Sequence, residues 1–198
     1  MKHLLISTVI ILNFILASIP DINDSRWNNI QNDNITIDYI WDKGLPWCKS
    51  IITLNYSSEK ILSVIKDISN YENIFDSVIF SKEYDNNIVH IVLDLPGMFN
   101  NRDYVVQFNS TNDNQSIIYE FKSIKNVIKL SDDFVRLSNA GGKWKLESKN
   151  NNFTKVTYIW NGDMAGNFPS WGLKRAWTKQ GNEVLSNLKT ALDNNGEF

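Results

Sequence analysis

Between residues 78 and 160 the chain repeats one pattern: short runs of β-branched and aromatic residues, broken by turn-forming stretches such as Asp85-Asn-Asn87 and Asn112-Asp-Asn114. Runs of this kind are typical of strands, and the polar stretches between them favour tight connections. We expect seven strands here, over Val78–Tyr84, Ile88–Leu95, Tyr104–Asn109, Ser116–Ile124, Phe134–Ser138, Gly142–Glu147 and Lys155–Trp160. A long uninterrupted series of strands joined by short turns predicts a mainly antiparallel sheet.

The last part of the chain has a different period. After Pro169 apolar residues recur at helical spacing to about Asp193, which predicts one long C-terminal helix. The expected apolar stripe consists of Leu173, Trp177, Val184, Leu188 and Ala191. Gly181 lies inside this stripe, and a glycine in mid-helix costs about 1 kcal/mol relative to alanine. We therefore expect a close approach to a neighbouring element at Gly181.

Before the main series of strands the pattern is mixed. Asp24–Asn32 is consistent with a short helix, and Ile35–Trp41 alternates as a strand does. The turn Gly44-Leu-Pro46 leads into a second strand, Cys48–Tyr56, so the two strands could pair as a hairpin. Ser57 or Ser58 then caps a helix.

The order of elements predicts an α+β fold of one domain. The economical arrangement is a curved antiparallel β-sheet wrapped around the long C-terminal helix. The concave face of the sheet and the apolar stripe of the helix can then leave a cavity between them. Pockets of this kind are lined mainly by apolar and aromatic side chains.

The first residues differ from the rest. Leu4 to Ala17 is a nearly continuous apolar run after a weakly positive start, too short to span a bilayer, which needs about 20 residues. Its length matches a secretory signal, so we expect a signal peptide over residues 1–18, a domain over residues 24–195, and a secreted or periplasmic protein. An uncleaved anchor or a buried N-terminal helix is the alternative.

Composition excludes several kinds of chemistry. The formal net charge is -2 and the chain has no block of five basic residues, so we expect no nucleic-acid partner. A single cysteine, Cys48, excludes an internal disulfide, and the two histidines, His3 and His90, do not supply a histidine metal site. We expect no catalytic residue, metal or cofactor. A nucleophile pair of Cys48 and His90 would require two residues from separate strands to come together.

Three stretches carry a family resemblance. Leu95–Val105 contains a proline and then Arg-Asp-Tyr-Val; Gly141–Leu146 is followed by Thr154–Tyr158; and Gly166–Trp171 has the form Gly-x-x-Pro-x-Trp. In order and spacing these resemble segments of the START / birch-pollen-allergen superfamily, whose helix-grip fold wraps a bent antiparallel sheet around a C-terminal helix. Family members hold sterols, phospholipids or other apolar molecules, and some relatives are aromatase/cyclases.

The resemblance implies a START-like domain that binds, or also transfers, a lipid or other apolar small molecule in an internal cavity. The candidate ligand-binding residues are Arg102, Tyr104, Phe99, Trp144, Trp160, Trp171, Trp177 and Gly181. The tryptophans could equally well serve as core. We expect a monomer, and leave transient membrane contact open. Two alternatives remain: an enzyme of the same fold, cyclase- or hydrolase-like, and an interaction protein whose core is filled, with no cavity of roughly 300 Å³.

The adjacent charges Arg102 and Asp103 fall at the start of an expected strand, where neighbouring side chains point to opposite faces. They are therefore not expected to pair with each other. One of them could meet the polar head of a ligand while the other holds the preceding loop; alternatively, both are surface charges.

Overall fold

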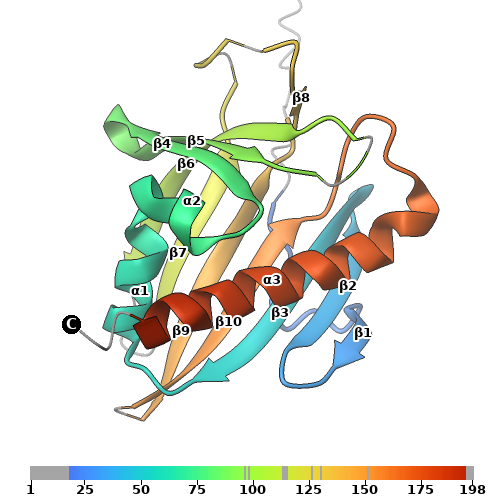
Figure 1. The fold of residues 1–198 in the computed structure, drawn as a ribbon. Helices are drawn as coiled ribbons and strands as arrows, with labels where there is room; N and C mark the ends of the chain where they lie inside the picture. Colours follow the sequence, from blue (N-terminus) through green and yellow to red (C-terminus); the bar gives the residue numbers. More distant parts are fainter. Residues whose placement is uncertain are drawn as a thin grey trace, which may run out of the picture.

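The computed structural model describes residues 18–95, 97, 99–112, 116–125, 127–129, 131–150 and 152–194, without the side chain of Asn150. One large sheet carries helices on one of its faces (Figure 1). The strands are β1 (Asn28–Asn32), β2 (Thr36–Asp42), β3 (Leu45–Leu54), β4 (Val78–Tyr84), β5 (Ile88–Leu93), β6 (Arg102–Asn112), β7 (Ser116–Ser123), β8 (Val135–Arg136), β9 (Gly141–Asn150) and β10 (Phe153–Asn161). The α-helices are α1 (Ser58–Lys66), α2 (Tyr71–Ile74) and α3 (Leu173–Asn194), and the short 3₁₀ turns are η1 (Ile68–Asn70), η2 (Asp85–Asn87) and η3 (Ser170–Gly172).

The sheet has the order β1-β2-β3-β10-β9-β7-β6-β5-β4, and all neighbours along this path are antiparallel. Strand β8 lies off this path and pairs in parallel with the start of β6. The sheet is open, with β1 and β4 at its edges, and α3 crosses one face of it (Figure 1). The expected class, an α+β helix-grip fold with an antiparallel sheet against a long C-terminal helix, is confirmed.

The expected early hairpin forms from β2 and β3, with Asp42 opposite Leu45. Its turn places Lys43 at φ 50° and Gly44 at φ 79°. Two successive positive φ values match the twist of a two-residue hairpin turn, and glycine adopts such a conformation without steric cost. The second strand starts directly after this turn, so it includes Pro46, which the sequence had placed in the turn.

Two expectations about local structure are wrong. The segment Asp24–Asn32 is no helix: its second half, Asn28–Asn32, forms the edge strand β1 paired with β2. Asparagine has low propensity for helix and strand alike, so pairing with β2 decides the outcome. The expected strand Phe134–Ser138 shrinks to the two residues Val135–Arg136, because only these pair with β6.

The helix α1 begins where the sequence predicts. Ser57 is its N-cap, and the Ser57 hydroxyl accepts a hydrogen bond from the backbone N–H of Lys60. Glu59 lies in the first turn, where the helix dipole favours an acid. Ile61 and Ile65, one turn apart, are both fully buried and fix the face that α1 presents to the core.

The close approach expected at Gly181 is present. A Cβ atom at this position would lie 3.0 Å from Cδ1 of Ile37 and 3.1 Å from Cη2 of Trp160. The buried stripe of α3 differs slightly from the expected one, and consists of Trp177, Gly181, Leu185, Leu188 and Leu192. The expected members Leu173, Val184 and Ala191 are only partly buried beside it.

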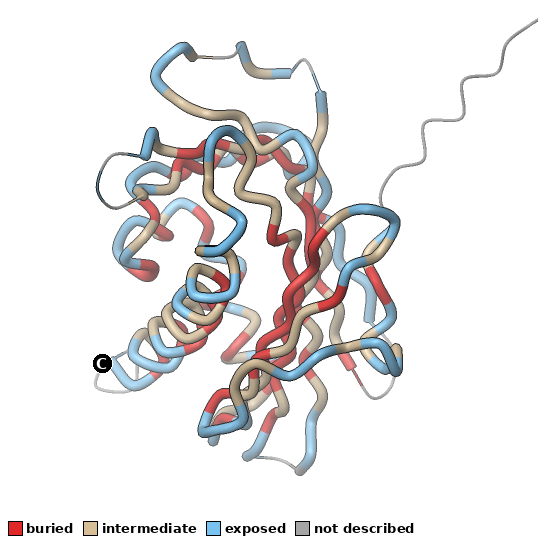
Figure 2. The backbone as a smooth tube through the Cα atoms, turned by 90° about the vertical axis from the view of Figure 1, so that its right-hand side faces the viewer, coloured by how far each residue is buried: buried red, intermediate tan, exposed pale blue. Residues whose placement is uncertain are grey.

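The larger hydrophobic core lies between the helices and the sheet, and buried positions follow the strands (Figure 2). A second, smaller cluster contains Ile40, Trp47 and Ile159, which alternate with residues of the main core along their strands. Residues 18–27 cover this cluster, chiefly through Ile19, Ile22 and Trp27. Packing on this side therefore includes residues from Ile19 onward, and the expected domain bounds, residues 24–195, stay a prediction.

The expected signal peptide lies outside the described residues apart from Ser18, and stays a prediction. Within the part of the chain that is described, no helix is long and apolar enough to cross a membrane.

Candidate functional site: a cleft at the mouth of the sheet

The strand β6 starts with the two adjacent charges, and its alternation sends them to opposite faces as expected. Arg102 is 2% exposed. Its guanidinium donates to three carbonyls: Nε to Met164 at 3.0 Å, Nη2 to Ala165 at 3.2 Å, and Nη1 to Asn100. Arg102 therefore ties the loop before β6 to the loop after β10.

Asp103 lies on the other face of β6. Its carboxylate accepts two hydrogen bonds from Arg136, at 2.8 and 2.6 Å, and lies 2.9 Å from Nε2 of His90. Burial raises the pKa of the Asp103 carboxyl, but the hydrogen bonds from Arg136 and His90 outweigh it and hold that pKa below its usual value. Asp103 thus anchors β8 to β6 and is a structural group.

A cleft of about 310 Å³ opens where the loop before β6, the loop after β10 and the first half of α3 meet. Its lining is mostly apolar, and among the lining residues are Leu93, Leu95, Phe99, Phe168, Trp171 and Ala176. Cleft volumes of about 300 to 1,000 Å³ are usual for small-molecule sites. We call this space the mouth cleft.

A much smaller pocket of about 50 Å³ lies deeper, between the sheet, α2 and α3. It is lined mainly by aromatic side chains, including Tyr71, Phe75, Tyr104, Phe108, Trp144 and Tyr158. We call this space the inner pocket. Both spaces are bordered by Ser77, Leu93 and Gln180, so they are neighbours along one path from the surface to the core.

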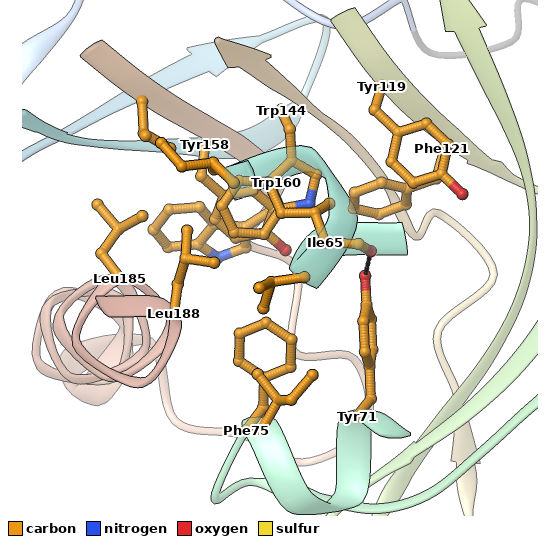
Figure 3. Packing of buried hydrophobic residues seen from close by; sticks show 14 of the residues in the cluster. Ile65, Tyr71, Phe75, Tyr119, Phe121, Trp144, Tyr158, Trp160, Leu185 and Leu188 are labelled. Carbon is orange, nitrogen blue, oxygen red and sulfur yellow. Dashed lines mark hydrogen bonds between the residues drawn. The ribbon is translucent and has the colours of Figure 1, made fainter. Parts of the chain in front are cut away.

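Aromatic rings fill the space beside the inner pocket (Figure 3). Tyr158 stacks on Trp144 at 4.2 Å and on Trp160 at 5.1 Å between ring centroids. Across the sheet Phe121 lies 6.4 Å from Tyr158. Offset stacking of this kind adds to the stability gained by burial alone. The interior is therefore narrow, and the larger space lies at the mouth.

Five of the predicted site residues border one of these two spaces. Phe99, Arg102 and Trp171 line the mouth cleft, whereas Tyr104 and Trp144 line the inner pocket. Trp171 is 85% exposed and stands at the rim. Burial raises the pKa of the Tyr104 hydroxyl, so this group stays neutral.

The other three, Trp160, Trp177 and Gly181, line neither space. Trp177 is fully buried and its ring N–H donates to the carbonyl of Gly162 at 2.8 Å. Trp160 packs against Gly181, as described above. These contacts show that Trp160, Trp177 and Gly181 belong to the packed core.

Sequence reasoning missed most of the polar residues that line the mouth cleft, among them Asn161 at the end of β10 and Glu183 in the middle of α3. A signal was available for each. Asn161 directly follows a run of buried strand residues, and Glu183 is a carboxylate next to the apolar stripe that contains Gly181.

The groups needed for the catalytic alternatives are not brought together. Strands β3 with Cys48 and β5 with His90 are separated by β10, β9, β7 and β6, which amounts to roughly 24 Å at about 4.8 Å per strand spacing. Burial also raises the pKa of the Cys48 thiol, which disfavours the thiolate. Among the described residues, no three His, Cys, Asp or Glu side chains gather as metal ligands do.

No protein-family model matches the chain, and no curated protein matches it in sequence. Solved structures do match. A STAR-related lipid transfer protein from Xanthomonas axonopodis superposes with a TM-score of 0.75 at 20% identity, over 85% of this chain and 99% of that one. Human StAR-related lipid transfer protein 5 gives 0.78 at 12% identity, over 88% and 90%.

A more distant likeness is to the Zhui aromatase/cyclase from Streptomyces sp. R1128, with a TM-score of 0.50 at 11% identity over 74% of this chain and 93% of that one. At such identities the likeness establishes architecture and leaves the activity open. The likeness to these solved structures, together with the order of the sheet and the long helix α3 across it, shows that this chain has a START-like helix-grip fold.

Proposed function

We propose that the protein binds a lipid or other apolar small molecule in the mouth cleft and transfers it between membranes. The observation that carries this proposal is the cleft itself, about 310 Å³ in volume and lined mostly by apolar side chains. Burying apolar surface supplies roughly 25 cal/mol per Å², before the cost of immobilising the ligand. The solved neighbours named as lipid transfer proteins support the same reading.

The inner pocket limits how a ligand is held. Its 50 Å³ has room for one or two groups of water size, since a water molecule occupies about 30 Å³ in the liquid. The main apolar part of the ligand therefore rests in the mouth cleft. Deeper insertion requires Tyr104 or its aromatic neighbours to change rotamer.

Two loops form the rim through which a ligand passes. Phe99, from the loop before β6, meets Phe168, from the loop after β10, at 5.1 Å between ring centroids. Separation of these rings would widen the cleft. Trp171 beside them is almost fully exposed, and tryptophan favours the membrane–water interface. We propose that this rim makes the transient membrane contact.

Catalysis is the weaker proposal. An enzyme of this fold would need an acid–base group, for which Arg102, Asp103, Tyr104 and His90 are the candidates. His90 and Asp103 bind each other away from the two cavities. Arg102 is held by carbonyls, and the raised pKa of Tyr104 keeps this hydroxyl from acting as a base near neutral pH. We therefore propose a binding protein. Secretion or a periplasmic location, and a monomeric state, stay predictions.

Vesicle-to-vesicle transfer of a fluorescent lipid tests the proposal. Ala176→Trp places a large ring in the mouth cleft and should abolish uptake and transfer, whereas Ser186→Trp, at an exposed position of the same helix, should leave both unchanged. Absence of uptake by the wild-type protein, or equal transfer by both variants, would contradict it.

A further inference from the structure

A third space lies on the face of the sheet that points away from the helices (Figure 1). The side chains of Asp103 and Val105, two positions apart on β6, both point to this face, because Tyr104 between them lines the inner pocket on the side of α3. Val105 is only 2% exposed there, since the connection between β7 and β9, residues 124–140, lies over it. Between this connection and β6 a groove of about 620 Å³ remains, which we call the outer groove.

Hydrogen bonds fix the frame of the outer groove. On its returning side, β8 pairs with the start of β6, and the backbone N–H of Leu137 donates to the carbonyl of Asp103 at 2.8 Å. The hydroxyl of Ser123, at the end of β7, donates to the carbonyl of Ser138 at 2.8 Å and so joins the two sides of the connection. The walls of the groove are therefore tied to the sheet and to each other.

The lining of the outer groove is apolar at its base and cationic at its rim. Its apolar side chains are Val105, Ile124, Ile128 and Leu137. Buried Val105 forms the base, whereas the lining residues Lys125 and Lys129 are exposed. A lysine lays its aliphatic stem along apolar surface while its ammonium group stays in water. This arrangement fits an occupant that has an apolar tail and a charged head.

The charge of the lining has one sign. The third cation, Arg136, is already balanced, because it donates two hydrogen bonds to the buried carboxylate of Asp103, at 2.8 and 2.6 Å. No carboxylate is among the described residues that line the groove, and Asp132 and Asp133 of the same connection are exposed outside it. The lining therefore has a surplus of positive charge, which attracts an anionic head and repels a cationic one.

From these observations we propose that the outer groove is a second ligand site, which binds a small amphipathic anion such as an alkyl carboxylate. The tail lies against Val105 and Ile128, and the carboxylate meets the ammonium groups of Lys125 and Lys129. This site goes beyond the proposed function, since it lies outside the space between sheet and helix. Leu137 borders both the outer groove and the mouth cleft, so a test must close one space while it probes the other.

Calorimetric titration of the Ala176→Trp protein, in which a ring fills the mouth cleft, tests the outer groove by itself. The probes octanoate, octanol and octylamine share one tail, and acetate is the anion without it. Octanoate should bind about fivefold more tightly than octanol, the effect of about 1 kcal/mol that an ion pair at exposed lysines supplies, and octylamine should bind more weakly than both. Acetate should not bind measurably, because it lacks the apolar part. Added salt should remove the preference for octanoate.

Two matched substitutions locate the charge that binds the head. Lys129→Gln should remove most of the preference for octanoate and leave the affinity for octanol unchanged. Lys189→Gln removes the same charge from an exposed position in the last turns of α3, outside the groove, and should change neither affinity.

The outcomes separate this inference from lipid binding in the mouth cleft. Equal binding of octanoate and octanol by Ala176→Trp, or equal effects of Lys129→Gln and Lys189→Gln, overturns the outer groove as an anion site. Lys129-dependent binding to vesicles of phosphatidylcholine and phosphatidylglycerol, without binding of octanoate, also overturns it, because this face would then meet a membrane. None of these results changes uptake by the mouth cleft. If Ala176→Trp does not fold, the two lysine variants compared in the otherwise wild-type protein still decide.

Discussion

At the scale of single residues, the pair Arg102–Asp103 shows how one strand start serves two faces. Because side chains alternate along β6, those of Arg102 and Asp103 point to opposite faces of the sheet, and this could be predicted from the sequence. Their partners could not, because Met164, Ala165 and Arg136 approach only after distant loops have folded. Both charges turn out to be structural, and Arg102 also borders the mouth cleft.

Replacing Arg102 should destabilise the fold. Arg102→Met leaves the carbonyls of Asn100, Met164 and Ala165 without their donor and is expected to lower the free energy of unfolding by about 2 to 4 kcal/mol. Urea denaturation measures the loss. Arg175→Met, at an exposed position, should change it by less than about 0.5 kcal/mol, and equal effects of the two substitutions would refute the role of Arg102.

The carboxylate of Asp103 should make stability depend on pH at the acid end. Its pKa in the folded protein is lowered, so its stabilising contribution is present above the usual unfolded pKa of about 3.9 and is lost as pH falls through the folded value. Wild type and Asp103→Asn should therefore differ in stability at pH 6, and the difference should shrink as the pH falls below about 3.9. A difference that stays constant from pH 6 to pH 2 would contradict this.

Close packing at Gly181 makes a third test. Gly181→Val drives its side chain into Ile37 and Trp160, and overpacking of this kind costs about 1 to 3 kcal/mol. Thermal unfolding compared with Ser186→Val, an exposed position of α3, separates the clash from the helix propensity of valine. Equal melting temperatures would show that α3 does not approach β2 as described.

At the scale of elements, the strands and the last helix could be predicted because their periods differ and each extends over many residues. The segment 24–32 could not, because it is short, rich in asparagine and set by pairing with β2. The buried stripe of α3 was placed slightly off: Leu185 and Leu192 are buried where Val184 and Ala191 were expected. Neighbouring apolar residues on a helix do not reveal which one faces the sheet.

The cap of α1 is a local signal that should have a local effect. Ser57→Ala removes the acceptor of the Lys60 N–H and should cost about 1 kcal/mol in the free energy of unfolding. Ser69→Ala, at an exposed position after α1, is a suitable reference. If chemical denaturation shows no difference between the two variants, the hydroxyl of Ser57 does not stabilise the helix.

At the scale of the whole molecule, the mouth cleft was predictable in outline only. The order of elements indicated a space between sheet and helix, and the rim residues Phe99 and Trp171 were found. The sequence could not assign tryptophans to core or cavity, since both need the same apolar side chains. Trp160 and Trp177 are buried in the core. The larger of the two spaces between sheet and helix is the mouth cleft near the surface, and Asn161 and Glu183 are among the residues that line it.

The account as a whole depends on an apolar molecule occupying that cleft. Native mass spectrometry of the protein purified without detergent tests this directly, by comparing its mass with that of the denatured chain. We expect an added mass that organic solvent removes and that is absent from Ala176→Trp. A bare polypeptide mass in every preparation, including after incubation with lipid vesicles, would contradict the central claim.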